Sequence, residues 1–205
     1  MSSAIVLSIL FLASLLLFIF LYLSLKNTEL FSKAIILGLA AFFLSSLLHY
    51  ILPSLLFQIF PWLAMPLTQA FLLTACIEDG IRYQCLRFIR QENTLKTASA
   101  LMVVALVFAT LESHYYWNVQ SGFIFIFVRL LGALPLHLGC AFIMASIPRA
   151  GLWMSITFHG LYNYFLAISA PLIMSAATLV LMLLIAVIRF KQLKTEETPP
   201  QIKYF

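Results

Sequence analysis

Charged side chains are scarce in this 205-residue chain: Asp, Glu, Lys and Arg together make up 9% of it, whereas 63% of its residues are hydrophobic. Soluble domains carry about 25% charged residues, and a water-soluble fold could not cover this much apolar surface. Cysteine is also scarce, and no two of Cys76, Cys85 and Cys140 have the spacing of metal ligands. The composition therefore excludes an ordinary soluble domain and indicates an integral membrane protein.

The net charge of +5 does not indicate a nucleic-acid partner. The basic residues lie in short segments between apolar runs and form no basic face of their own. We therefore expect no nucleic acid among the partners of the chain, and we expect its surroundings to be a lipid bilayer.

Long apolar stretches account for most of the sequence, and each is close to the 17–25 residues (about 30 Å of helix) that cross a bilayer core. We expect the first to be a retained span, because it lacks a charged leading region and a small-residue cleavage site. The sequence predicts an all-α, polytopic transmembrane helical bundle of about seven spans. It forms one domain over 1–190, followed by a short cytoplasmic tail at 191–205. The stretches are 4–25, 34–59, 66–86, 98–117, 122–147, 152–169 and 172–190.

The distribution of Lys and Arg predicts the orientation. If the N-terminus lies outside the cell membrane, ten basic residues fall in inner segments and none falls in an outer loop. This asymmetry matches the positive-inside rule and an odd number of spans. We therefore expect a protein of the cell (inner) membrane with a cytoplasmic C-terminus. The ten are Lys26, Lys33, Arg87, Arg90, Lys96, Arg149, Arg189, Lys191, Lys194 and Lys203.

Several ionisable residues lie inside the apolar stretches, where a charge at a helix centre costs roughly 2.5–3.5 kcal/mol. Residues of this kind need partners or a wet cavity, and they mark functional sites in membrane proteins. Arg129 is expected to pair with an acidic residue or a lipid headgroup, and His49 is not expected in the site. The set is Glu78, Asp79, Arg82, Glu112, Arg129, His137 and His159.

Spacing and depth bring some of these residues together. Glu78 and Arg82 are four apart and share a helical face, as do His159 and Asn163. At 1.5 Å per residue, Glu78 lies roughly 18 Å and His137 roughly 22 Å from the outer ends of their spans. His159 lies roughly 10 Å from the inner end of its span, so these three share a level nearer the cytoplasm. Glu112 lies nearer the outer end.

Four motifs in order resemble an intramembrane protease superfamily that includes the PrsW proteases, the YhfC-like proteins and the CAAX-processing proteins. The resemblance covers residues 70–165, favours the PrsW-like branch and implies an endopeptidase that cuts a membrane-embedded or membrane-associated protein. The second acid, the base and the last residue of the final motif depart from the PrsW pattern. The counterparts are Glu78-Asp79-x-x-Arg82, Phe108-x-x-x-Glu112, His137 and His159-x-x-x-Asn163.

Two chemistries are compatible with this implied site. In both, Glu78 is the general base that activates water, with Asp79 and Arg82 beside it. In the first, Glu112, His137 and His159 bind a divalent metal such as zinc, which polarises the carbonyl. In the second, no metal takes part: Glu78 and Glu112 handle the proton, and His159 with Asn163 donates to the oxyanion.

Three other interpretations stay open. The Glu78–Arg82 pair and the His159–Asn163 pair can be structural, since buried pairs and hydrogen bonds also join helices. A proton-coupled transporter likewise carries acids and imidazoles inside its bundle. A scaffold with the same fold would bind a partner helix without cutting it. Replacing Glu78 with Gln separates the protease from the transporter and the scaffold. It should abolish cleavage in a protease, change transport in a transporter and leave a scaffold intact.

Overall fold

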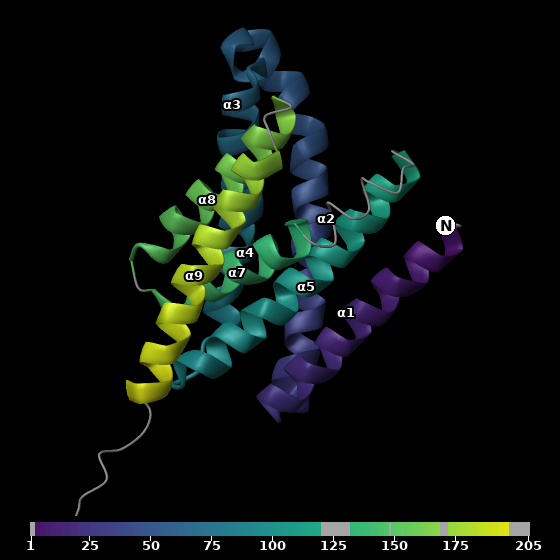
Figure 1. Cartoon of the computed structure of the whole chain (residues 1–205). Coiled ribbons are helices and arrows are strands. Elements are labelled where there is room, and N and C mark those ends of the chain that lie inside the picture. The colour runs from purple at the N-terminus through teal and green to yellow at the C-terminus, as the bar shows by residue number, and fades with distance from the viewer. Residues whose placement is uncertain (1–2, 120–131, 148, 169–171, 197–205) are drawn as a thin grey trace, which may run out of the picture.

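The computed structural model describes residues 3–119, 132–147, 149–168 and 172–196, and within these ranges the chain is helical with no strand (Figure 1). Two long helices come first, and a 3-10 helix, η1, follows them. The next helical run continues without a break from Pro66 to Ile89 through a short α-helix, a π-helix and α4. The elements are α1 (Ser3–Leu25), α2 (Thr28–Ile59), η1 (Pro61–Ala64), α3 (Pro66–Thr68), the π-helix η2 (Gln69–Ala75), α4 (Cys76–Ile89), α5 (Thr94–Val119), α7 (Leu134–Ser146), α8 (Gly151–Ala167) and α9 (Leu172–Glu196).

The prediction of an all-α fold is confirmed over the described residues. Each of the seven apolar stretches coincides with a helix, except that residues 122–131 of the fifth stretch lie outside the described residues. Three segments, Thr28–Ile59, Thr94–His114 and Ile173–Glu196, are long and apolar enough to cross a membrane. Apolar segments in α1 and α7 are shorter. The bundle of about seven spans therefore stays a prediction.

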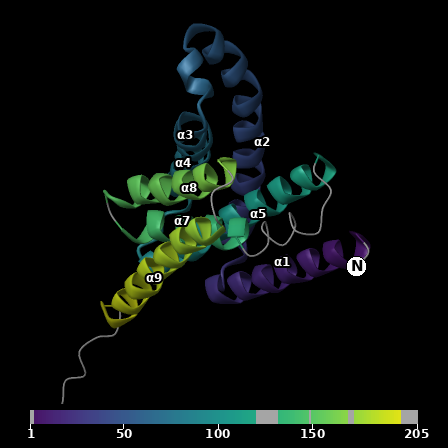
Figure 2. The ribbon, with the colours of Figure 1, turned by 45° about the horizontal axis from the view of Figure 1, so that its top comes forward.

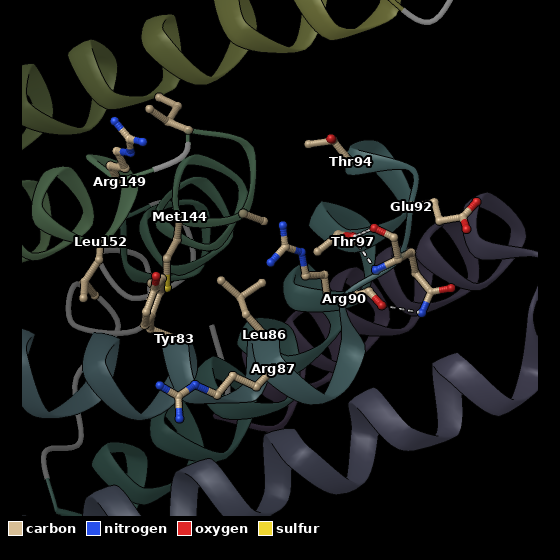
Figure 3. Close-up of a pocket in the computed structure, with 13 residues that line it drawn as sticks. Tyr83, Leu86, Arg87, Arg90, Glu92, Thr94, Thr97, Met144, Arg149 and Leu152 are labelled. Carbon is tan, nitrogen blue, oxygen red and sulfur yellow. Dashed lines mark hydrogen bonds between the residues drawn. The ribbon is translucent and has the colours of Figure 1, made fainter.

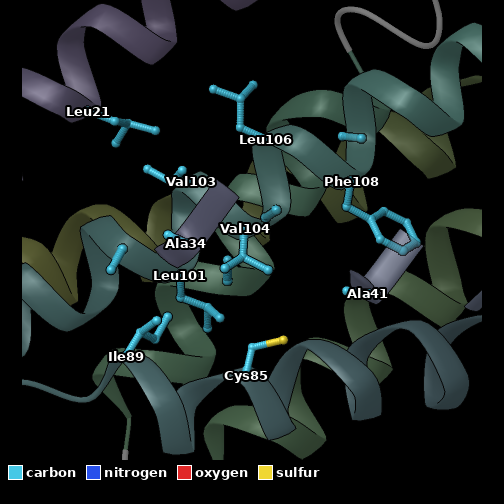
Figure 4. Close-up of a cluster of buried hydrophobic side chains, with 14 of the residues drawn as sticks. Leu21, Ala34, Ala41, Cys85, Ile89, Leu101, Val103, Val104, Leu106 and Phe108 are labelled. Carbon is cyan, nitrogen blue, oxygen red and sulfur yellow. The ribbon is translucent and has the colours of Figure 1, made fainter. Parts of the chain in front are cut away.

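The core of the fold is built around α5, as Figure 4 shows. Residues 103–109 of this helix are buried on all sides, which fits a helix that is apolar around its whole circumference. Helix α2 packs closely along it: a Cβ at Gly38 would lie 2.7 Å from the Cβ of Val107. Helices α1, α4 and α7 also contribute to this cluster. Helix α5 thus supplies a rigid centre from which Phe108 and Glu112 project.

The outward faces of the peripheral helices are apolar. On α2, Ile36 and Phe43 are 65% and 66% exposed, and on α9 Ile173 is 73% exposed. Soluble monomers rarely expose contiguous apolar patches beyond a few hundred Å². These faces have the character of a surface in contact with lipid.

The basic residues gather toward one end of the helices. The α1–α2 connection, the α4–α5 connection and the C-terminal end of α9 all lie toward the lower end of the bundle in Figure 1, and Figure 2 agrees. The connection from α2 to α3 lies at the opposite end, and it contains neither Lys nor Arg. Of these described connections, the two at the lower end carry basic residues and the one at the opposite end carries none.

The helix that carries Glu78 begins with a π-helical segment. In this segment each backbone hydrogen bond spans five residues instead of four, and the amide of Cys76 bonds to the carbonyl of Phe71. π-Helical turns of this kind often occur near functional sites. Helix α8 packs against this segment, and a Cβ at Gly160 would lie 2.5 Å from the Phe71 ring. The glycine lets α8 approach closely enough to bring His159 to α4.

Candidate functional site

Side chains from three helices converge in the interior of the bundle. Glu78 of α4, His137 of α7 and His159 of α8 each offer one ligand atom, and these atoms lie within 4.8 Å of one another. All three side chains are buried, with at most 3% of each residue exposed. The two imidazole rings meet edge to face, with centroids 5.1 Å apart. The structure thus brings together the three residues that the depth argument places at one level.

Arg82 lies at the centre of this group and is fully buried. Its Nη2 atom forms an ion pair with Asp79 Oδ1 at 2.6 Å and lies 3.6 Å from Glu78 Oε2. Its Nη1 atom donates a hydrogen bond to His137 Nδ1 at 2.8 Å, and Nη2 lies 3.4 Å from His159 Nδ1. One guanidinium group therefore joins α4 to both histidine helices, a role that goes beyond neutralising Glu78.

Asp79 is held from two sides, although it points about 100° away from Glu78 on an ideal helix. Its Oδ1 atom faces Arg82 and lies 3.4 Å from His159 Nδ1. Its Oδ2 atom accepts a hydrogen bond from the Ser155 hydroxyl at 2.8 Å. Ser155 stands one turn before His159 on α8, so its bond to Asp79 ties α8 to α4 beside this imidazole. The sequence offers no signal that would single out Ser155.

Glu112 reaches the site through His137. Its Oε2 atom lies 3.0 Å from His137 Nε2, while His137 Nδ1 accepts from Arg82. A guanidinium group can only donate, so a neutral His137 carries its proton on Nε2 and donates it to Glu112. Glu112, which the sequence places nearer the outer end of its span, thus joins the site as a partner of His137.

This hydrogen-bond pattern does not fit the expected metal set of Glu112, His137 and His159. Zinc requires nitrogen and oxygen donors about 2.0–2.2 Å away, each with a free lone pair. Both nitrogens of His137 are engaged, one by Arg82 and the other by Glu112. The compact group contains Glu78 in place of Glu112, and the guanidinium of Arg82 already supplies a cation beside it.

A polar cavity of about 430 Å³ leads to the site between α2, α4 and α5. Glu78 and Glu112 both line it, and Tyr50, 83% exposed, stands at its margin. His49 lines it as well: its Nε2 atom lies 2.7 Å from the Leu73 carbonyl and 4.0 Å from Glu78 Oε1. His49 was not expected in the site. Like the other site residues, His49 is an ionisable residue inside an apolar stretch, and this feature of the sequence could have identified it.

Two residues singled out from the sequence are not brought into this group. Asn163 is half-buried on α8, one turn beyond His159, and no hydrogen bond joins it to the other residues of the site within the described part of the chain. Arg129 lies outside the described residues. The role of Asn163 as a donor to an oxyanion therefore stays a prediction.

Comparison with known proteins gives no assignment. No family model matches the chain, and no curated protein or solved structure matches it either.

Proposed function

We propose that this chain is a membrane-embedded peptide hydrolase in which Glu78 is the general base. The observation that carries the proposal is the state of Glu78 Oε2, a buried carboxylate oxygen that has no hydrogen-bond partner. Glu78 also lines the 430 Å³ polar cavity, which is large enough to hold water. Its Oε2 atom lies 3.6 Å from Arg82 Nη2 and 3.6 Å from His159 Nε2. A carboxylate at the edge of a polar cavity, with one oxygen that forms no hydrogen bond, is suited to accept a proton from water.

The reaction needs water, a base, and a donor for the oxyanion. Glu78 takes a proton from water as the water oxygen bonds to the scissile carbonyl carbon, and a tetrahedral oxyanion forms. The Nε2 edge of His159 faces Glu78 Oε2 at 3.6 Å, so it stands where it can donate to this oxyanion. Glu78 then gives the proton to the leaving nitrogen as the C–N bond breaks, which yields an acid and an amine.

The remaining polar residues hold these two groups in place. Arg82 fixes both imidazoles through their Nδ1 edges, and Asp79 fixes Arg82. Glu112 orients His137. No step in this scheme requires a metal, and the resemblance to the PrsW and CAAX-type superfamily supports the same reaction class.

We place this site inside a lipid bilayer. The exposed apolar faces of α2 and α9, and the three segments long enough to span, support membrane insertion. The basic connections at one end support a cytoplasmic location for that end, with the N-terminus outside. The substrate is then a membrane-embedded or membrane-associated protein that reaches the cavity beside α2.

Glu78→Gln tests the proposal. Membranes containing the full chain, wild type or variant, are analysed by mass spectrometry for new N-termini in membrane proteins. The wild type should generate such termini, and the variant should lose them by about 10²–10⁴-fold, the usual effect of removing a general base. Glu29→Gln, an exposed acid in the first turn of α2, is the matched control and should leave them unchanged.

A proton-coupled transporter is the second candidate, because His49, Glu78 and His159 form a row of titratable groups with separations of 4.0 and 3.6 Å. The same variant distinguishes the two functions. In vesicles with an enclosed pH indicator, a transporter would lose proton flux in Glu78→Gln, with no change in peptide termini. Equal termini and equal flux in wild type and variant would favour a scaffold.

A further inference from the structure

A second cavity, separate from the Glu78 site, opens at the basic end of the bundle. It measures about 490 Å³ and lies where α4 ends, α5 begins, α7 ends and α8 begins (Figure 3). Arg87, Arg90 and Arg149 line it, and in Figure 3 they surround Tyr83 and Leu86. Arg87 from the last turn of α4, Arg90 from the α4–α5 connection and Arg149 from the α7–α8 connection thus line one cavity.

The three guanidinium groups have no partner within the described part of the chain. No ion pair or side-chain hydrogen bond engages Arg87, Arg90 or Arg149, and all three residues are exposed. Glu92 also lines the cavity, so its formal charge is +2, from three arginines and one carboxylate. Glu92 forms no ion pair with any of these arginines. The cavity therefore holds uncompensated positive charge, in contrast to Arg82, which is fully paired.

The backbone adds to this positive field. Arg149 adopts φ 66°, in the left-handed region that non-glycine residues rarely occupy. This conformation sits immediately before α8, whose N-cap residue Ala150 provides no side-chain hydrogen bond. The Gly151 amide bonds to the Ile147 carbonyl, and the N-terminal end of this 17-residue helix carries the partial positive charge of the helix dipole. Strained backbone of this kind is often retained at ligand sites.

The lining is amphipathic, which limits the class of ligand. Besides the arginines and the hydroxyls of Tyr83 and Thr94, the cavity wall contains Leu86 and Leu152. Arginine pairs with phosphate through two parallel hydrogen bonds, and basic pockets between helices on the cytoplasmic side bind anionic headgroups. A phospholipid presents both parts together, a phosphate next to apolar chains.

We propose that this cavity binds the phosphate of an anionic membrane lipid at the cytoplasmic face. The inference rests on the membrane location of the chain and is independent of peptide hydrolysis at Glu78. Phosphate is the shared chemistry of a lipid headgroup and a soluble phosphate compound. The apolar part of the wall and the position of the cavity at the ends of the helices identify the lipid as the source.

The test uses the full chain in nanodiscs of phosphatidylcholine that contain a minor share of phosphatidylglycerol, followed by native mass spectrometry of retained lipid. The wild type should retain phosphatidylglycerol in preference to phosphatidylcholine. Arg90→Ala should lower that preference by about fivefold, which corresponds to about 1 kcal/mol for one basic contact. Arg149→Gly should do the same without loss of the fold, since φ 66° suits glycine. If both variants retain phosphatidylglycerol with the wild-type preference, the proposal is overturned.

A matched control separates a pocket from general surface attraction. Lys33 is exposed near the same end of the bundle and does not line the cavity, so Lys33→Ala should leave the preference unchanged. An equal loss in Lys33→Ala and Arg90→Ala would mean diffuse electrostatics, which overturns the site. A second arm adds inorganic phosphate to protein in neutral detergent. If phosphate alone raises the unfolding temperature as much as phosphatidylglycerol does, the ligand is a soluble phosphate and the lipid assignment is wrong.

Discussion

Replacing Arg82 with methionine should destabilise the protein severely, because the change leaves buried charge without its counterion. Arg82 is 0% exposed, and it pairs with Asp79 at 2.6 Å. Removing one partner of a buried ion pair typically costs about 3–5 kcal/mol, since the other partner stays desolvated. Methionine keeps most of the apolar stem, so the loss reports on the guanidinium group more than on packing volume.

The contacts of Arg82 place this variant toward the upper part of that range. Its guanidinium also bonds to His137 at 2.8 Å and lies 5.0 Å from the centroid of the Phe108 ring. A cation–π contact in a desolvated setting adds about 2 kcal/mol. Lysine keeps the charge but lacks the planar fork, so Arg82→Lys should recover part of the loss and leave one of the two imidazoles without its donor.

The assay is unfolding of the purified full chain in detergent, with circular dichroism as the readout. Arg87→Met is the control, since Arg87 is exposed on the same helix and should stay within about 0.5 kcal/mol of wild type. In a double-mutant cycle, Asp79→Asn and Arg82→Met should couple by about 0.5–3 kcal/mol. A loss below about 1 kcal/mol for Arg82→Met, or additive losses in the cycle, would refute the central role of this guanidinium.

Two further predictions concern packing and orientation. Gly160→Ala should lower the free energy of unfolding by about 1–3 kcal/mol in the same assay, because the new Cβ would meet the Phe71 ring. Gly80→Ala is the control: a Cβ there has nothing within 4 Å, so the change should stabilise the protein by up to about 1 kcal/mol. Equal effects of the two variants would contradict the close approach of α8. A cysteine at Ala64 should react with an impermeant thiol reagent from outside the cell and one at Glu92 should not, and the reverse labelling would refute the orientation.

The helices were predictable from the sequence because lipid and packing impose the same requirement on each one, a long apolar run. The lengths of the runs gave most helix ends to within a few residues, with two larger differences among the described residues. Helix α9 continues to Glu196, beyond the predicted 190, so the predicted tail of 191–205 is wrong at its start. Helix α2 begins at Thr28, well before the predicted 34. Asn27 explains the difference: its side chain accepts from the amide of Leu30 and starts the helix in a polar segment. A capping residue acts locally, so hydropathy alone does not find it.

The sequence predicts the residues of the site less completely than the helices. Which side chains meet depends on how each helix is rotated about its axis, and apolar runs do not reveal this rotation. The i,i+4 spacing puts Glu78 and Arg82 on one face, but it does not reveal that Arg82 also reaches His137 and His159. His49 lies outside residues 70–165, which the family resemblance covers, and the sequence does not predict it in the site. Its place near Glu78 follows from the close packing of α2 on α5, which Gly38 permits.

The sequence presents three carboxylates inside apolar runs, Glu78, Asp79 and Glu112, and packing gives each of them different contacts. Asp79 is engaged by Arg82 and Ser155, and Glu112 by His137. Glu78 alone among the three keeps a buried oxygen without a hydrogen bond while also lining a polar cavity. Asp79 Oδ1 also forms no hydrogen bond, but it lies 2.6 Å from Arg82, and Asp79 does not line the cavity. Two acids thus hold the cationic and imidazole groups in position, and the third is the one we propose as the base. The choice of Glu78 as base follows from this division and would fail if Glu112→Gln abolished activity while Glu78→Gln did not.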